Sequence, residues 1–365
     1  TARRDIEKNK WLEIADLDAK ETTEELYEKA LKEDTLVVYS VTTRAFDVKE
    51  SFEKEYPEIT VEIKDIRSKD VIDMVKKSYD EESFLCDVVI CSNCNGTVYK
   101  DLVEPGICYT YVPWDMKDVI SEKNREPLLN FIGEAILPFY NTSIYEESPI
   151  NNIWELTEEQ YYKKIIMANP LRSFSTYAFC ATLLKQSEEI ENAYMEYTGK
   201  PLKIAAGETA GEVFWKKFAP QVVFVNSSDD VVEGVGNDSG MHIGFMISSK
   251  MRFLDIGYEF APIYQLCPFA GVYTPNSVAI VEGSKSINSA KLFIRYLLGG
   301  ADGTGEGGKP FISAGTWSTR TDVEDGNDRS IDEIEMIDFD AAYIYENKEE
   351  IDTFFESMLM ESIEN

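Results

Sequence analysis

The first residues that could bind a ligand form a short run of hydroxyls followed by an arginine. The apolar run 36–39 leads directly, with no proline or glycine, into Ser40, Thr42, Thr43 and Arg44. Hydroxyls can donate hydrogen bonds to phosphate or sugar oxygens, and a guanidinium can hold an anion through two parallel hydrogen bonds. The alternative is structural, because Thr42 or Thr43 can cap a helix that starts here.

A similar pattern occurs later in the chain. The apolar run 165–168 leads into Asn169, Arg172, Ser173, Ser175 and Thr176, and helical spacing follows. The free N–H groups and partial positive charge of a helix N-terminus suit an anion or a polyol. One such loop is weak evidence, but two in separate parts of the chain predict the facing walls of one cleft.

Five further polar residues complete the candidate set. Ser92 and Asn93 follow the apolar run 86–91, and Asn237, Asp238 and His242 precede the apolar run 243–247. The Asp238 carboxylate and the His242 imidazole could hydrogen-bond sugar hydroxyls, although a buried structural histidine is an equal alternative. Capping, turn formation or surface exposure is the alternative for every other candidate, and Arg172 is expected to lie at the surface.

The elements that must position these residues alternate between strand and helix. Short apolar runs at 36–39 and 86–91 and the alternating segment 58–66 predict strands, and apolar spacing predicts helices at 47–56, ended near Pro57, and after Ser68. Thr22 and Glu25 fit a capping box that starts an earlier helix. A β-α-β-α-β order is typical of a parallel sheet, whose ligands gather at the carboxyl ends of the strands.

The same organisation restarts after Pro138. Strands are expected near 139, 165 and 222 and at 243–247, followed by a strand and a helix within 275–298. The last segment, 321–365, holds 16 Asp or Glu residues and 2 Arg or Lys residues. Apolar residues at helical spacing predict a folded tail helix with outward charges, and its buried stripe consists of Ile351, Phe354, Phe355, Met358 and Leu359.

The composition narrows the class of protein. The 365 residues are enough for two or three domains, and 44% hydrophobic content supports real cores. With 67 acidic and 36 basic residues the formal charge is −31, so nucleic acid and anionic lipid are not expected partners. No apolar run is long enough to span a membrane. The start, TARRDIEKNK, is not a signal peptide, but a chain trimmed of one would look the same.

Three features are weighed as signs of a metal, a nucleotide or catalysis. The C-x4-C-x2-C spacing resembles an iron–sulfur pattern, but a strand run separates the first two cysteines, so buried thiols or one disulfide near Cys91 and Cys94 are preferred. The segment 303–310 reads G-x-x-x-x-G-K followed by proline, which lacks the hydroxyl that a phosphate loop needs for magnesium. A single histidine and the absence of G-x-S-x-G disfavour catalysis, so no enzyme activity, cofactor or metal is predicted.

The ordered segments resemble the extracellular solute-binding proteins of ABC importers, in the group with ferric-ion-binding and hexose-phosphate- or phosphonate-binding members. The resemblance runs over residues 35–323 and rests on LVVYSVTTRAFDVKESFEKEYPEITVEI, CDVVICSN, VEPGICYTYVPW, FYNTSIYEESPINNIWEL, KIIMANP, TPNSVAIVEGSKSINSAKLFIRYLL and GTWSTRTDV.

The resemblance implies an α/β fold of the type II periplasmic-binding-protein kind, with two lobes, a hinge of two crossing strands and a ligand cleft between the lobes. Lobe 1 would comprise residues 1–136 and 274–325, with residues 1–33 as an N-terminal helical extension. Lobe 2 would comprise residues 137–273 and 326–365, the latter with the acidic C-terminal helices.

The function implied is capture of a small anionic solute by lobe closure, and delivery to an ABC permease in the membrane. The location implied is extracellular or periplasmic, with a membrane anchor upstream of Thr1 left open, and the protein would be a monomer. A sensor that signals to a membrane histidine kinase is an alternative with the same ligand. A metal-dependent enzyme that uses the cysteines is another.

The solute is narrowed by a departure from the family pattern. Ferric binders of this group use an adjacent tyrosine pair, and here that position falls near Ser248, Ser249 and Lys250. Without phenolates a ferric ion loses its main anionic ligands, so a ferric-iron transport protein becomes the alternative. The hydroxyls and arginines that remain suit a sugar phosphate, a phosphonate or a carboxylate.

Overall fold

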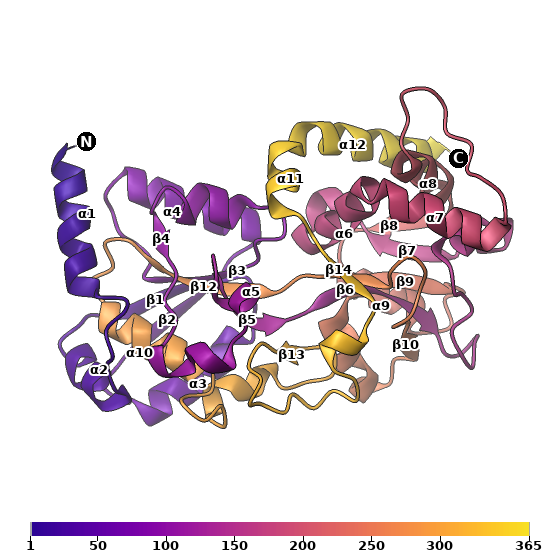
Figure 1. The fold of residues 1–365 in the computed structure, drawn as a ribbon. Helices are drawn as coiled ribbons and strands as arrows, with labels where there is room; N and C mark the ends of the chain where they lie inside the picture. Colours follow the sequence, from indigo (N-terminus) through magenta and orange to yellow (C-terminus); the bar gives the residue numbers. More distant parts are fainter. Residues whose placement is uncertain (1, 365) are drawn as a thin grey trace. The chain divides into compact units, whose positions relative to one another are not determined.

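The computed structural model describes residues 2–364, and the chain divides into two compact units (Figure 1). Unit 1 comprises Thr1–Gly133 and Pro275–Gly326, and unit 2 comprises Glu134–Thr274 and Asn327–Asn365. The chain therefore passes from one unit to the other after Gly133, after Thr274 and after Gly326. Each unit contains its own sheet.

The sheet of unit 1 has the strand order β13-β5-β12-β3-β1-β2, and β4 also pairs with β12. Strands β1 and β2 are parallel, as are β1 and β3, whereas β12 is antiparallel to both β3 and β5. The carboxyl ends of β1, β2, β3 and β5 and the start of β12 therefore share one edge. The strands are β1 (Leu36–Ser40), β2 (Val61–Asp65), β3 (Val88–Cys91), β4 (Cys108–Tyr109), β5 (Leu129–Gly133), β12 (Asn276–Val281) and β13 (Trp317–Ser318).

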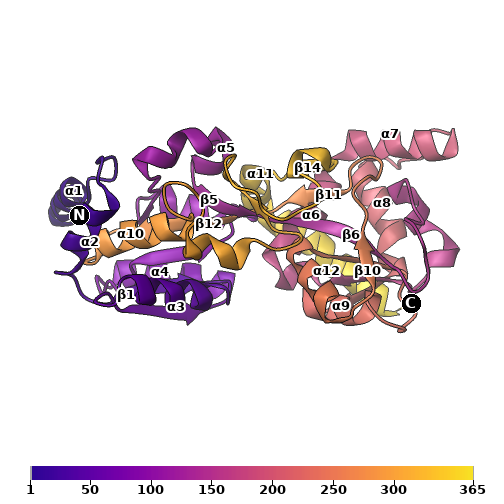
Figure 2. The ribbon, with the colours of Figure 1, turned by 90° about the horizontal axis from the view of Figure 1, so that it is seen from below.

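Helices cover both faces of this sheet. Leu36 and Val38 of β1 lie in one core cluster with Phe52 of α3 and Phe293 of α10, and α4 packs on β3. Helix α2 packs on α10 (Figures 1 and 2). The strands and helices predicted here are confirmed. The helices are α1 (Ala2–Ala15), α2 (Thr23–Ala30), α3 (Ala45–Glu55), α4 (Ser68–Asp80), α5 (Glu122–Arg125) and α10 (Ile287–Leu297), with shorter turns η1 (Val98–Val103), η2 (Trp114–Val119) and η8 (Glu306–Phe311).

The sheet of unit 2 has the strand order β14-β11-β6-β9-β7-β8, and β10 also pairs with β6. Strands β7 and β8 are parallel, as are β7 and β9, whereas β6 is antiparallel to β9 and to β11. The carboxyl ends of β7, β8, β9 and β11 and the start of β6 therefore share one edge. The strands are β6 (Ala135–Asn141), β7 (Ile165–Ala168), β8 (Val222–Val225), β9 (Ile243–Ile247), β10 (Phe260–Pro262), β11 (Gly271–Tyr273) and β14 (Met336–Asp338).

The helices of unit 2 also pack on both faces of their sheet. Helix α9 packs on β7 and β9, α12 packs on β8, and Figure 1 shows these helices on opposite sides. The helices are α6 (Phe174–Lys185), α7 (Ser187–Thr198), α8 (Ala210–Phe218), α9 (Ser228–Val235), α11 (Ala341–Glu346) and α12 (Lys348–Glu364). The turns are η3 (Ile153–Thr157), η4 (Glu159–Tyr161), η5 (Pro170–Arg172), η6 (Ala219–Gln221), η7 (Ser248–Ile256) and η9 (Ile331–Glu333). Within residues 2–364 no helix has the length and apolarity needed to cross a membrane.

The apolar stripe predicted for the tail is confirmed only in part. Ile351, Phe355 and Met358 of α12 are buried, at 1%, 1% and 4% exposure. Phe354 and Leu359 are half-buried, because they lie at the sides of the stripe. The acidic tail is therefore a packed helix of unit 2.

The structure tests two local predictions, the start of α2 and the state of the cysteines. The predicted capping box is confirmed, since the Thr22 hydroxyl accepts from the Glu25 N–H and the Glu25 carboxylate accepts from the Thr22 N–H. All six cysteines are free, which excludes the alternative disulfide near Cys91 and Cys94. Burial raises the pKa of the Cys91 thiol to about 12, so this thiol stays protonated and unreactive.

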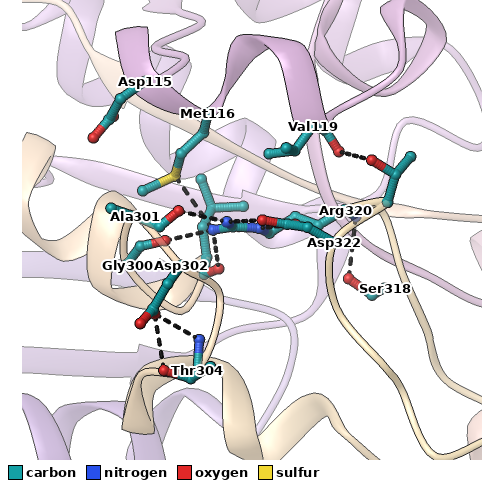
Figure 3. Close-up of polar contacts among 12 residues, drawn as sticks. Asp115, Met116, Val119, Gly300, Ala301, Asp302, Thr304, Ser318, Arg320 and Asp322 are labelled. Carbon is teal, nitrogen blue, oxygen red and sulfur yellow. Dashed lines mark hydrogen bonds and ion pairs between the residues drawn. The ribbon is translucent and has the colours of Figure 1, made fainter.

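Arg320 binds the loop that follows α10 in unit 1 (Figure 3). Its guanidinium is buried and donates to the carbonyls of Leu298, Gly300 and Ala301. It also forms a two-point ion pair with Asp322, at 2.8 and 2.9 Å, and the pair lowers the pKa of the Asp322 carboxyl. These three carbonyls belong to the C-cap residue of α10 and to the loop beyond it, so one planar side chain satisfies backbone oxygens that the helix leaves without a partner.

Replacement of Arg320 by lysine should destabilise unit 1. A single ammonium cannot reach three carbonyls and a carboxylate at once, so buried oxygens lose their partners. We expect a loss of about 2 kcal/mol in the free energy of unfolding, measured by urea denaturation with tryptophan fluorescence. Arg67→Lys, at an exposed position, is the control and should change stability by less than about 0.5 kcal/mol. Equal stability of the Arg320 variant and the wild type would contradict this role.

Candidate functional site

In unit 1, the hydroxyls at the end of β1 form hydrogen bonds within the loop that follows the strand. The Ser40 hydroxyl donates to the Thr42 carbonyl at 2.9 Å and accepts from the Thr42 N–H at 3.1 Å. The N-cap of α3 is Arg44, and no side chain caps it, so the capping alternative for Thr42 and Thr43 is wrong. Thr43 is exposed on this loop. The loop is therefore a polar turn at the carboxyl edge of the sheet.

Arg44 lies at the same edge and is held by residues far along the chain. Its Nη1 donates to the Thr316 hydroxyl at 3.2 Å, and its guanidinium lies 4.9 Å from the centre of the Phe311 ring. The Thr42 hydroxyl accepts from its Nε at 3.5 Å. Sequence reasoning missed Phe311 and Thr316 as residues of this edge. The hydroxyl cluster in GTWSTRTDV was the available signal for Thr316.

Ser92 and Asn93 follow β3 and therefore lie at this edge too. The Ser92 hydroxyl donates to the Pro275 carbonyl at 3.1 Å, where the chain enters β12. The Asn93 side-chain oxygen accepts from the Tyr99 N–H at 2.9 Å and so helps to start the next helical turn. Of the candidates in unit 1, all six therefore come together at one edge of the sheet: Ser40, Thr42, Thr43, Arg44, Ser92 and Asn93.

In unit 2, the equivalent edge carries the start of α6. Ser173 is the N-cap, and its hydroxyl accepts from the Thr176 N–H at 3.3 Å and lies 3.2 Å from the Ser175 hydroxyl. The N–H groups of the first helical turn have no partner within the helix. The first turn also contains no acidic residue. Helix α6 therefore offers an uncompensated positive end.

Two buried threonine hydroxyls at this edge lack a hydrogen-bond partner among the described residues. The Thr176 hydroxyl, on the first turn of α6, belongs to a residue with 0% exposure. The Thr274 hydroxyl, just after β11, belongs to a residue with 2% exposure. Helix α6 packs on β11, which brings the two elements together. An unsatisfied buried hydroxyl is costly, so a ligand oxygen at this edge would remove a penalty. Sequence reasoning missed Thr274.

Three predicted site residues lie at the other edge of this sheet. Strands β7 and β9 run parallel from a common start, with Ile165 opposite Ile243, and His242 immediately precedes β9. The α6 loop follows the far end of β7, about 13 Å along the strands. The expectation that Asn237, Asp238 and His242 join Ser173, Ser175 and Thr176 is therefore wrong.

The residues at this second edge have structural contacts. The Asn237 carbonyl accepts from the Asn141 side chain at 2.9 Å, and Asp238 lies exposed in the adjacent turn. The His242 Nδ1 is hydrogen-bonded to the Tyr145 hydroxyl, and the Tyr145 and Tyr161 rings pack edge-on against the imidazole. Burial, assisted by the Lys164 charge, lowers the pKa of His242. His242 is thus a neutral structural residue, as the sequence alternative allowed.

The position expected to carry a tyrosine pair in ferric binders follows β9. Ser248 and Ser249 are buried there, and the Ser248 hydroxyl accepts from the Ala135 N–H at 3.0 Å. Lys250 forms an ion pair of 2.7 Å with Asp229. Within residues 2–364, no group of three or more His, Cys, Asp or Glu side chains could hold a metal ion.

The protonation of His242 tests its structural role. A histidine whose folded pKa is lowered stabilises the fold above its unfolded pKa, near 6.5, and this contribution is lost as the pH falls below that value. His242 is the single histidine, so its ring protons give one set of proton NMR signals. We expect these signals to titrate below pH 6.5, and His242→Gln to remove the corresponding slope of stability. Titration at or above pH 6.5 would contradict burial of the imidazole.

Comparisons with known proteins give a clear result for the fold. No family model matches the sequence, and no curated protein matches it. Solved structures do match. The apo ferric ion-binding protein A of Pasteurella haemolytica is 13% identical with a TM-score of 0.65, over 89% of this chain and 97% of that one.

Two further matches contain organic ligands. The periplasmic binding protein AfuA of Actinobacillus pleuropneumoniae, with exogenous fructose 6-phosphate bound, is 16% identical with a TM-score of 0.63, over 89% of this chain and 98% of that one. The binding protein MotA of Agrobacterium tumefaciens B6, in complex with glucopine, is 11% identical with a TM-score of 0.63, over 89% and 100% of the two chains.

These identities are low, so the likeness establishes the fold and not the ligand. The structural group predicted from the ordered segments is confirmed at the level of fold. The chain has the two-lobe α/β fold of type II periplasmic binding proteins.

Proposed function

We propose that the chain is the extracellular solute-binding receptor of an ABC importer and captures a small anionic solute. A sugar phosphate, a phosphonate or a carboxylate has the right chemistry. The observation that carries the proposal is the start of α6, where free N–H groups, the hydroxyls of the half-buried Ser173 and Ser175, and the unpartnered Thr176 hydroxyl gather without an acidic residue. Backbone N–H groups at a helix start are a common site for phosphate and carboxylate.

Unit 1 supplies a complementary kind of donor. Helix α3 has Asp47 in its first turn, so its start is less suited to an anion than that of α6. The Arg44 guanidinium lies there instead, beside Thr43 and the Thr42 hydroxyl. A guanidinium can bind two oxygens of one phosphate or carboxylate group. We propose that Arg44 and the α6 start contact the same solute when the two units close.

Delivery requires a partner in the membrane. The proposed receptor works outside the cell or in the periplasm as a monomer and releases its solute to an ABC permease. The solute must bind the closed form more tightly than the open form, because only differential affinity shifts the equilibrium between them. A hexose phosphate would use hydroxyl donors such as Ser92 and Ser175 for its sugar ring. No cofactor or metal is required.

Ferric-ion transport is the second candidate, favoured by the ferric-binding proteins among the structures of the same fold. The chain itself opposes it, since Ser248 and Ser249 stand where those proteins are expected to carry tyrosines. A sensor for a membrane histidine kinase would bind the same solute and differ only in its partner.

Thermal shift and calorimetry with sugar phosphates, phosphonates, dicarboxylates and ferric ion test the proposal. An anion at 100 times its Kd should stabilise the protein by about 2.7 kcal/mol. Arg44→Ala should weaken its binding roughly tenfold or more, because two charge-assisted hydrogen bonds are lost. Arg3→Ala, on the exposed face of α1, is the matched control and should bind as the wild type does.

Thr176→Val tests the start of α6 in unit 2, because stability and anion binding should respond differently to this change. The change removes a buried hydroxyl without a partner, so the free protein should be at least as stable as the wild type while anion binding weakens. Thr182→Val, in the same helix, is the control: its hydroxyl donates to the Ala178 carbonyl at 2.6 Å, so this change should cost stability and leave binding intact. Stabilisation by ferric salts alone, or unchanged anion binding in both site variants, would overturn the proposal.

A further inference from the structure

We infer that the glycine-rich segment 303–316 positions Arg44 for anion binding, with Phe311 and Thr316 as its positioning residues. Its first part, residues 303–310, has the G-x-x-x-x-G-K spacing that resembles a nucleotide phosphate loop. The inference rests on the proposed function, because the position of Arg44 affects anion binding only if Arg44 contacts the anion. The placement of Arg44 itself can be measured without any ligand.

Two different contacts from this segment act on one guanidinium. The Phe311 ring lies under the guanidinium, with its centre 4.9 Å from the central carbon, and the Thr316 hydroxyl accepts from Nη1 at 3.2 Å. The ring contact limits where the guanidinium can lie, and the hydroxyl holds its Nη1. The two contacts together restrict the position of the guanidinium.

Both positioning residues are themselves fixed by burial. Phe311 is 5% exposed and packs edge-on against Phe131 of β5, with ring centres 5.1 Å apart. Thr316 is 0% exposed, and its N–H donates to the Ser313 carbonyl at 3.0 Å. Rigid supports of this kind can hold a long side chain that would otherwise sample many rotamers.

Gly307 allows the segment to pack closely on α10. A Cβ at Gly307 would lie 2.1 Å from the Tyr296 carbonyl oxygen of α10, a distance that no side chain tolerates. Turn η8, which contains Gly307 and ends at Phe311, therefore packs directly on α10 and α3. Gly307 serves this close approach, and Pro310 is compatible with it because no phosphate needs a backbone donor there.

Preorganisation of Arg44 has a predictable energetic role. An arginine already held in its binding geometry loses less rotamer entropy when an anion arrives. Lysine at this position could not present two parallel donors. The segment thus raises affinity without touching the solute.

The first arm of the experiment measures Arg44 in the ligand-free protein by NMR. Its Nε–H signal is the one absent from the spectrum of Arg44→Lys. We expect this proton to exchange with water more slowly than that of the exposed Arg3, and about fivefold faster in Phe311→Leu than in the wild type. Phe293→Leu is the matched control, because it replaces another buried ring of unit 1, which packs on Phe52.

The second arm measures binding of inorganic phosphate and glucose 6-phosphate by calorimetry. Phe311→Leu should weaken the Kd about fivefold and Thr316→Val about threefold, with little further loss when either is combined with Arg44→Ala. Phe293→Leu and Thr182→Val should leave the Kd unchanged. A merely structural role for Phe311 or Thr316 would make its effect add to that of Arg44→Ala.

The two arms separate failure of the inference from failure of the proposed function. Unchanged Nε–H exchange in Phe311→Leu, or additive effects on Kd, would overturn the positioning role. If exchange is faster in Phe311→Leu but the wild-type protein binds neither anion, the positioning role is supported and a phosphate-bearing solute is contradicted.

Discussion

The direction of strand pairing is the constraint on which the candidate site depends. Because β1 and β3 are parallel, as are β7 and β9, the polar loops that follow these strands must lie at one edge of each sheet. The antiparallel strands β5, β12, β6 and β11 bring the chain crossings to these same edges, since β5 ends at Gly133 and β11 ends at Tyr273. Polar donors and crossing points are therefore neighbours in each unit by topology alone.

Under the proposed function, the two edges would contribute different chemistry to the binding of an anion. Unit 1 offers the positively charged Arg44 guanidinium, which contacts the Phe311 ring and the Thr316 hydroxyl. Unit 2 offers fixed partial charges at the start of α6, together with the Thr176 and Thr274 hydroxyls. A formal charge of −31 does not oppose an anion at these sites, because charges more than about 10 Å away are screened at ordinary salt.

Much of the fold could be predicted from periodicity, but the pairing of distant segments could not. Apolar runs and helical spacing identified β1, α3, β2, α4 and β3, and Thr22 with Glu25 identified the start of α2. These signals are local, so they need no knowledge of neighbours. The resemblance supplied the two-lobe fold, which the solved structures confirm.

The candidate site was predictable only where a residue directly follows a parallel strand. Ser40 ends β1, and Arg44 and Ser173 lie in the short loops after β1 and β7, so each lies at the expected edge of its sheet. His242 failed because polar residues before a strand look the same in sequence as those after one. Phe311 and Thr316 were missed since their relation to Arg44 arises from packing across some 270 residues of chain.

Hydrogen–deuterium exchange with one equivalent of bound anion tests the central claim most directly. If the two edges hold one solute, the amides of 42–48 in unit 1 and of 174–177 in unit 2 should gain protection together, at the same anion concentration. Protection confined to one unit, or reached at clearly different concentrations in the two, would contradict the claim that a single small anion is held by both.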